Sequence, residues 1–272
     1  MKLNHTKSII YLSVLLCLFL TIVSFAGGFI ESTYQRETTS LAVQGIGQDI
    51  FDLFIAAPLL LISLLLSLRQ SRTGIFILGG TVFYILYSFF IYSFGIHFNN
   101  LFVLYCFTLG TAFYLFILII AEFLNADVKN WFEEKIPARS TASYLILIAV
   151  LFYYMWFSDI IPAVMNNSVP ASVTGYNLLV NPVHVMDLSF VLPGLIIVSL
   201  LLIRKHRVGY IFVPVLLIFI VLLSMALSAM TIMLVLRNIS ADLSLAGIFG
   251  VLAIISSIFL IILLKRLKKN TA

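Results

Sequence analysis

Long apolar stretches recur along the whole chain, and they constrain its fold more than any other feature. A helix needs about 20 mainly apolar residues to cross the hydrocarbon core of a bilayer. Apolar runs and their flanking charges predict eight such helices, near residues 8–30, 49–68, 74–95, 101–123, 142–163, 182–203, 208–236 and 243–264. We therefore expect an all-α, polytopic transmembrane helical bundle.

The overall composition agrees with a lipid environment. Of the 272 residues, 62% are hydrophobic and 10% are charged, whereas a soluble domain is about half apolar and about a quarter charged. The first apolar stretch follows Lys2 and Lys7, as a secretory signal would. It is longer than the apolar region of a cleaved signal, so we expect a retained first helix.

The basic residues gather on one side of the expected bundle. With a cytoplasmic N-terminus, only Arg36 and Arg237 of the 16 Lys and Arg fall outside, which leaves 14 inside. The positive-inside rule then predicts that both termini are cytoplasmic and that the number of helices is even. The same clusters account for the net charge of +5, so nucleic acid is not an expected partner.

The sequence carries a candidate internal repeat. A shift of 135 residues aligns the second expected helix with the sixth without a gap. The aligned pairs are Asp52 with Asp187, Pro58 with Pro193, Arg69 with Arg204, Arg72 with Arg207 and Gly74 with Gly209. Acidic residues and prolines are uncommon enough in membrane helices to make this spacing informative.

The repeat predicts two parallel four-helix halves, residues 1–124 and 142–272, joined by a cytoplasmic linker at 125–141. Parallel repeats are related by an axis along the membrane normal, and transporters built in this way bind ligands between the halves. The linker carries Trp131 and Phe132 among charged residues. This pattern fits a short amphipathic helix at the interface or a solvated connector. A duplicated scaffold with no transport function is the alternative for the whole chain.

Acidic residues inside the expected helices are the first candidates for a binding site, because charge is costly in a bilayer. Asp52 and Asp187 lie inside the second and sixth helices, and Asp49 and His184 precede them by three residues, on the same helix face. Further polar candidates near the outer ends of neighbouring helices are Tyr84, Asn99, Asn100 and Tyr105. Together they predict an outward-facing site for an ion, a proton or a small polar solute.

Pro58 and Pro193 lie six residues inward from the two aspartates and are expected to kink both helices. If Asp52 and Asp187 shared a cavity, desolvation and mutual repulsion would disfavour their charged forms, as in a proton carrier or a cation site. In the structural alternative, Asp49 and Asp52 cap a helix N-terminus, His184 anchors the interface and the tyrosines form an aromatic belt.

The chain shows no motif that identifies an enzyme. Its histidines and carboxylates are too sparse for a predicted metal site, and no cofactor is expected. We expect binding or translocation of a small solute or cation, with a lipid-directed membrane enzyme or a non-catalytic scaffold as alternatives. The bilayer is the expected partner, and homo-oligomerisation stays open.

Several short segments resemble an uncharacterised family of bacterial and archaeal multi-pass membrane proteins with about eight helices. The segments are Gly47-Gln48-Asp49 leading into Pro58, Arg69 to Ser71, Tyr84, Tyr87, the stretch from Phe98-Asn99-Asn100 to Tyr105, and Asp187 to Pro193. The resemblance covers most of the chain. It implies a helical bundle in a prokaryotic plasma (inner) membrane and no particular activity.

The charge distribution yields a topology prediction. Reporter fusions after Arg72, Lys135, Arg207 and Lys269 should signal cytoplasm, and fusions after Glu37, His97, Asn167 and Ser240 should signal the outside. A phosphatase that is active only outside and a fluorescent protein that is fluorescent only inside give the two readouts. A cytoplasmic signal from the Asn167 fusion would contradict the eight-helix topology.

Overall fold

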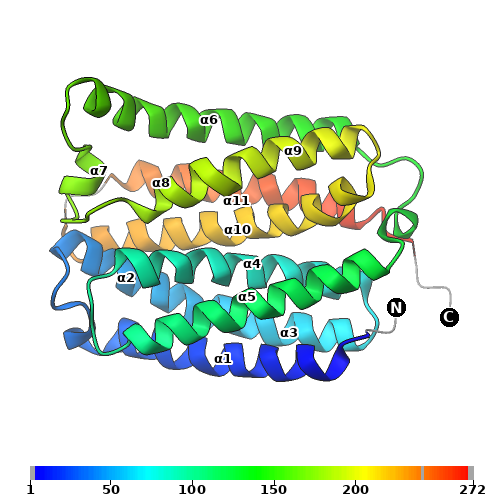
Figure 1. Ribbon diagram of the computed structural model, residues 1–272, viewed down its shortest axis with the longest axis horizontal. Helices are drawn as coiled ribbons and strands as arrows, with labels where there is room; N and C mark the ends of the chain where they lie inside the picture. The colour runs from blue at the N-terminus through cyan, green and yellow to red at the C-terminus, as the bar shows by residue number, and fades with distance from the viewer. Residues whose placement is uncertain (1–3, 240–241, 269–272) are drawn as a thin grey trace.

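The computed structural model describes residues 4–239 and 242–268, and this part of the chain forms an all-helical bundle (Figure 1). It contains eight helical segments that are long and apolar enough to cross a membrane. They are α1 (Thr6–Phe29), α2–η2–α3 (Thr39–Phe51, Asp52–Ala56, Ala57–Leu68), α4 (Arg72–Gly95), α5 (Phe102–Asn125), α6 (Ala138–Met165), α8–η4–α9 (Pro182–Met186, Asp187–Val191, Leu192–Ile203), α10 (Arg207–Leu236) and α11 (Leu243–Leu264). The expected bundle of eight helices is confirmed, and the chain has the make-up of a multi-pass membrane protein.

Two helices form the centre of the bundle. Of the most apolar stretch of each span, 72% is buried in α4 and 67% in α10, against 17% in α6 and in α11. Helix α2 packs on α10, α8 packs on α4, and α4 and α10 pack on each other. The start of α1 and the end of α11 lie at the same end of the bundle (Figure 1). Lys2, Ser240 and Lys269 lie outside the described residues.

The second span begins at Thr39, ten residues before its expected start at residue 49. The Thr38 side chain caps it by accepting the Leu41 N–H at 3.4 Å. Its first turns are polar and rich in glycine, and they are packed against other helices instead of lying in a loop. A methyl group added at Gly47 would lie 2.7 Å from the Met230 Cα atom on α10. The interpretation of Asp49 and Asp52 as N-terminal capping residues is therefore wrong, because both lie well inside this helix.

The second and sixth spans each carry a π-helical turn, which lies just before Pro58 and Pro193, respectively. The turns are η2 (Asp52–Ala56) and η4 (Asp187–Val191), and an aspartate begins each of them. The Ala57 N–H donates to the Asp52 carbonyl oxygen, and the Leu192 N–H donates to the Asp187 carbonyl oxygen. Proline lacks an N–H and disturbs the preceding turn, which a single wider turn accommodates. The two turns share the 135-residue spacing of the sequence pattern.

The linker at 125–141 is neither an interfacial α-helix nor a solvated connector. It contains one short turn, η3 (Val128–Trp131), and Trp131 and Phe132 are 7% and 2% exposed. The Lys268 N–H donates to the Trp131 carbonyl oxygen at 2.8 Å, and the Arg266 guanidinium pairs with Glu133 at 3.0 Å. The two aromatic side chains pack between helix ends. This position buries more of their surface than a place at the membrane–water interface would.

Gly47 offers a test of the close contact between α2 and α10. Gly47→Ala should lower the free energy of unfolding by about 1–3 kcal/mol, because the methyl group would overlap the α10 backbone. The matched control is Gly110→Ala, where nothing lies within 4 Å of the added atom. The control should be neutral or slightly stabilising, since alanine is the better helix former. Thermal unfolding in detergent compares the two, and equal midpoints would contradict the packing described.

Candidate functional site

A cavity of about 350 Å³ lies between the N-terminal and C-terminal helices and is called here the central cavity. Helices α2, α4, α6, α8 and α10 contribute most of its wall, and residues around α7 (Ala171–Thr174) line its outer end. Most of the lining is apolar. Its polar members are Gln44, Gln48, Tyr87, Ser88, Tyr92, Trp156, Ser172, Tyr176, Asn181 and Asp187. Both the volume and this mixture are typical of sites for small organic ligands, about 300–1,000 Å³ in size.

Asp187 places a carboxylate on the wall of the central cavity. The π turn that it begins directs the side chain between α4 and α6, where two neutral donors reach it. The Tyr87 hydroxyl donates to Oδ1 at 2.9 Å, and the Trp156 indole N–H donates to Oδ2 at 2.8 Å. The ion pairs among the described residues are Glu37 with His97 and Glu133 with Arg266. No cationic side chain of this part of the chain therefore balances Asp187.

Asp52 lies behind the cavity wall, and Gln48 separates it from the central cavity. The Gln48 amide nitrogen donates to Asp52 Oδ2 at 3.2 Å and also to the Tyr84 hydroxyl. Tyr84 in turn donates to Asp52 Oδ1 at 2.7 Å. A carboxylate only accepts hydrogen bonds, so Asp52 fixes the orientation of the Gln48 amide. The Gln48 carbonyl oxygen has no partner within the described residues, and Gln48 itself lines the cavity.

Asp49 is enclosed by tyrosines and has no exposed surface. The Tyr34 hydroxyl donates to its Oδ2 atom, and Tyr92 donates to Oδ1 at 3.2 Å. Gly27 makes room for this cluster, because a methyl group there would overlap Asp49 and Tyr34. Burial and the neighbouring Asp49 raise the pKa of Tyr34 well above its ordinary value. The Tyr34 hydroxyl therefore keeps its proton and acts as a donor.

His184 packs on Trp156, with ring centres 4.5 Å apart. Its Nε2 atom lies 3.5 Å from the Ser172 hydroxyl, which donates to Asp159. A nucleophilic serine must pass its proton to the imidazole. Here the hydroxyl proton is directed to the carboxylate instead, so the three residues do not form a catalytic triad. His184 supports the cavity wall through Trp156.

The remaining predicted site residues lie away from the central cavity. Tyr105 is 1% exposed and accepts a hydrogen bond from the Asn99 amide at 3.1 Å. Asn99 also donates to the Thr33 carbonyl oxygen at 3.3 Å. Asn99 and the exposed Asn100 line a separate pocket of about 140 Å³ between outer loops. These residues join the loops of the first four spans to one another.

Sequence reasoning missed several residues of the cavity wall. Gln48 lies four residues before Asp52 and Tyr87 lies three after Tyr84, so helical spacing could have identified both. Trp156 gave no such signal. Its contact with Asp187 depends on how α6 packs against η4, which periodicity along one helix does not reveal.

Two buried tyrosines on α4 provide a matched test of the carboxylate contacts. Tyr84→Phe should lower the free energy of unfolding by about 1–3 kcal/mol, because Asp52 and Gln48 both lose a partner away from water. Tyr87→Phe should cost less, since Asp187 keeps the Trp156 bond and lines a cavity. Tyr11→Phe, at a position that is 72% exposed, is the control. Thermal unfolding in detergent that ranks Tyr87→Phe as the more damaging change would contradict the described geometry.

Neither a metal site nor a similarity to known proteins indicates a function for this chain. Among residues 4–239 and 242–268, no three His, Cys, Asp or Glu side chains come together in a way that could hold a metal ion. The chain matches no protein-family model, no curated protein and no solved structure. The central cavity and the residues that line it are therefore the basis for assigning a function.

Proposed function

We propose that this protein binds a small organic solute, carrying a cationic or hydrogen-bond-donating group, in an outward-facing cavity between two four-helix halves. The halves would be parallel repeats with both termini in the cytoplasm of a prokaryotic cell. Three features support the repeat. The two π turns both begin with an aspartate and are related by the 135-residue shift of the sequence pattern. The contact of α2 with α10 corresponds to the contact of α8 with α4. Helices α4 and α10, which the shift also relates, pack on each other at the centre.

The observation that carries the proposal is the unbalanced carboxylate of Asp187 on a mostly apolar wall. Removing a carboxylate from water costs several kcal/mol when no cation accompanies it. The Tyr87 and Trp156 bonds recover part of this cost but supply no charge. A bound cationic group would supply the missing charge, so the cavity is suited to a donor and not to an anion.

The other polar groups of the wall favour the same ligand. Trp156 and Tyr87 already donate to Asp187, Tyr92 donates to Asp49, and the Gln48 amide nitrogen is used by Tyr84 and Asp52. The groups left for a ligand are mainly acceptors, the Asp187 carboxylate and the Gln48 carbonyl oxygen. An ammonium group has three donors and no acceptor, which matches this wall.

The central cavity narrows sharply beyond Asp187. On the inner side of Asp187, the residues between α6, η4, α9 and α10 leave about 30 Å³ of space. Release toward the cytoplasm would require α8–η4–α9 to move relative to α10. The π turn in this span is a natural place for such movement, since wider turns recur at functional sites of helices.

Tryptophan fluorescence offers a direct test. The chain has 2 tryptophans, so Trp131→Phe leaves Trp156 as a reporter in the cavity wall. Titration with n-butylammonium should change its emission saturably, whereas n-butanol should not. In this background, Asp187→Asn should weaken n-butylammonium binding by roughly 10–100-fold, the loss expected for a hydrogen bond to a charged group.

Asp159→Asn is the matched control. Asp159 bonds to Ser172 near the cavity but is not part of the cavity wall, so its replacement should leave the affinity for n-butylammonium within about twofold of the parent. Failure of n-butylammonium to change the Trp156 emission, or equal affinities in Asp187→Asn and the parent, would reject the proposed binding function.

A further inference from the structure

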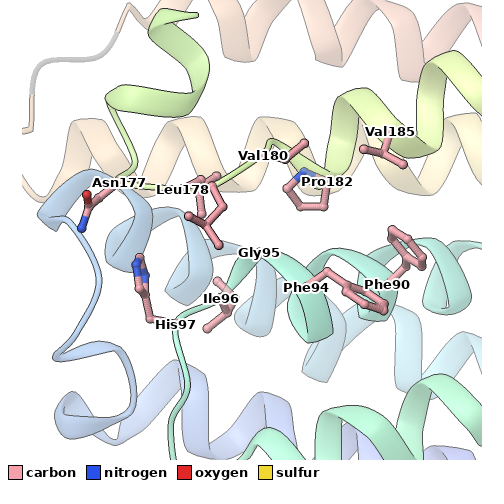
Figure 2. A pocket seen from close by; sticks show the side chains of 11 residues that line it. Phe90, Phe94, Gly95, Ile96, His97, Asn177, Leu178, Val180, Pro182 and Val185 are labelled. Carbon is pink, nitrogen blue, oxygen red and sulfur yellow. The ribbon is translucent and has the colours of Figure 1, made fainter. Parts of the chain in front are cut away.

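A second pocket of about 460 Å³ opens beside the central cavity and is called here the side pocket. Phe90 and Phe94 at the end of α4 form one wall, and Val180, Pro182 and Val185 form the opposite wall (Figure 2). Phe94 is 67% exposed and Val180 is 60% exposed. The side pocket therefore opens at the flank of the bundle, between two membrane spans, and its walls are mainly apolar.

The side pocket adjoins the central cavity. Gly95, Ile96, Leu178 and Pro182 line both of them, so these residues form the boundary between the two. Helix α4 and the start of α8 approach most closely there. A methyl group on Gly95 would lie 2.6 Å from the Pro182 ring. Glycine, which has no side chain, therefore allows the two helices to approach this closely.

The two spaces differ in chemistry in a way that matches an amphipathic molecule. The central cavity offers the uncompensated Asp187 carboxylate and the Gln48 carbonyl oxygen, whereas the side pocket offers aromatic and aliphatic walls open to the flank. A purely polar ligand would occupy the central cavity and leave the apolar side pocket empty. A molecule with an ammonium head and one hydrocarbon chain would use both spaces.

We propose that the solute is a single-chain amphipathic amine that enters sideways from the outer leaflet, with its ammonium group at Asp187 and its chain in the side pocket. This inference rests on the proposed binding function and adds the ligand class and the route. Entry from the leaflet suits the position of Phe94 and Val185, which are exposed on the flank of the bundle. Charge complementarity with Asp187 selects amines over neutral or anionic lipids.

The experiment compares a short and a long amine in the Trp131→Phe protein, held in lipid nanodiscs. The probes are n-butylammonium and n-dodecylammonium, with n-dodecanol as the uncharged control, and the readout is Trp156 emission. Val185→Phe fills the side pocket without reaching the central cavity, since Val185 lines only the former. Val150→Phe is the matched control, because Val150 is 52% exposed on α6 and lines neither space.

Val185→Phe should raise the apparent Kd of n-dodecylammonium by roughly tenfold or more and leave that of n-butylammonium within about twofold. Val150→Phe should change neither, and n-dodecanol should give no saturable signal. Phe94→Ala removes one wall of the side pocket without adding bulk. It should reduce n-dodecylammonium binding selectively as well, which keeps the test valid if Val185→Phe folds poorly.

The outcomes separate the inference from the proposed function. If both amines bind through Asp187 but Val185→Phe and Phe94→Ala affect them equally, or affect neither, the sideways route and the amphipathic ligand are rejected while the binding function stands. Saturable binding of n-dodecanol would also reject the amine assignment. If neither amine gives a signal that depends on Asp187, both proposals are rejected.

Discussion

The burial of carboxylates among apolar helices is the constraint around which this bundle is organised. Asp49, Asp52 and Asp187 are each at most 5% exposed, and each accepts hydrogen bonds from neutral donors. Helix α4 supplies half of these donors, because Tyr84, Tyr87 and Tyr92 reach three carboxylates on two spans. A buried carboxylate without donors would cost several kcal/mol, so these bonds fix how α2–η2–α3 and α8–η4–α9 sit against α4.

The second and sixth spans share one local geometry but place their aspartates differently. Both carry an aspartate at the start of a π turn and a proline just after it. In the second span, Asp49 is enclosed by Tyr34 and Tyr92. Gln48 stands between Asp52 and the central cavity. In the sixth span, Trp156 holds one face of Asp187 and leaves the carboxylate on the cavity wall. The same local geometry therefore leads to an enclosed carboxylate in one span and to a carboxylate on the cavity wall in the other.

The linker at 125–141 buries aromatic residues that its charged sequence would place at a surface. Trp131 and Phe132 pack beneath the helix ends, and Arg72 lies 5.6 Å from the Trp131 ring. The backbone of the same segment bonds to the end of α11 through Lys268 and Arg266. This arrangement joins the start of α4 to the segment that follows the last helix.

The sequence by itself determined the helical class, the number of spans and the aspartate–proline pattern, because apolar length, charge and proline act locally along the chain. It also identified Asp187 as a candidate site residue from the cost of charge in a span. It misplaced the start of the second span, because Gly47 and its polar neighbours form helix only when α10 covers them. The separation of Asp52 from the cavity, the exposure of Asp187 on its wall and the contact with Trp156 were decided by tertiary structure. These depend on which helices become neighbours, and neighbours distant in sequence leave no periodic signal within a single helix.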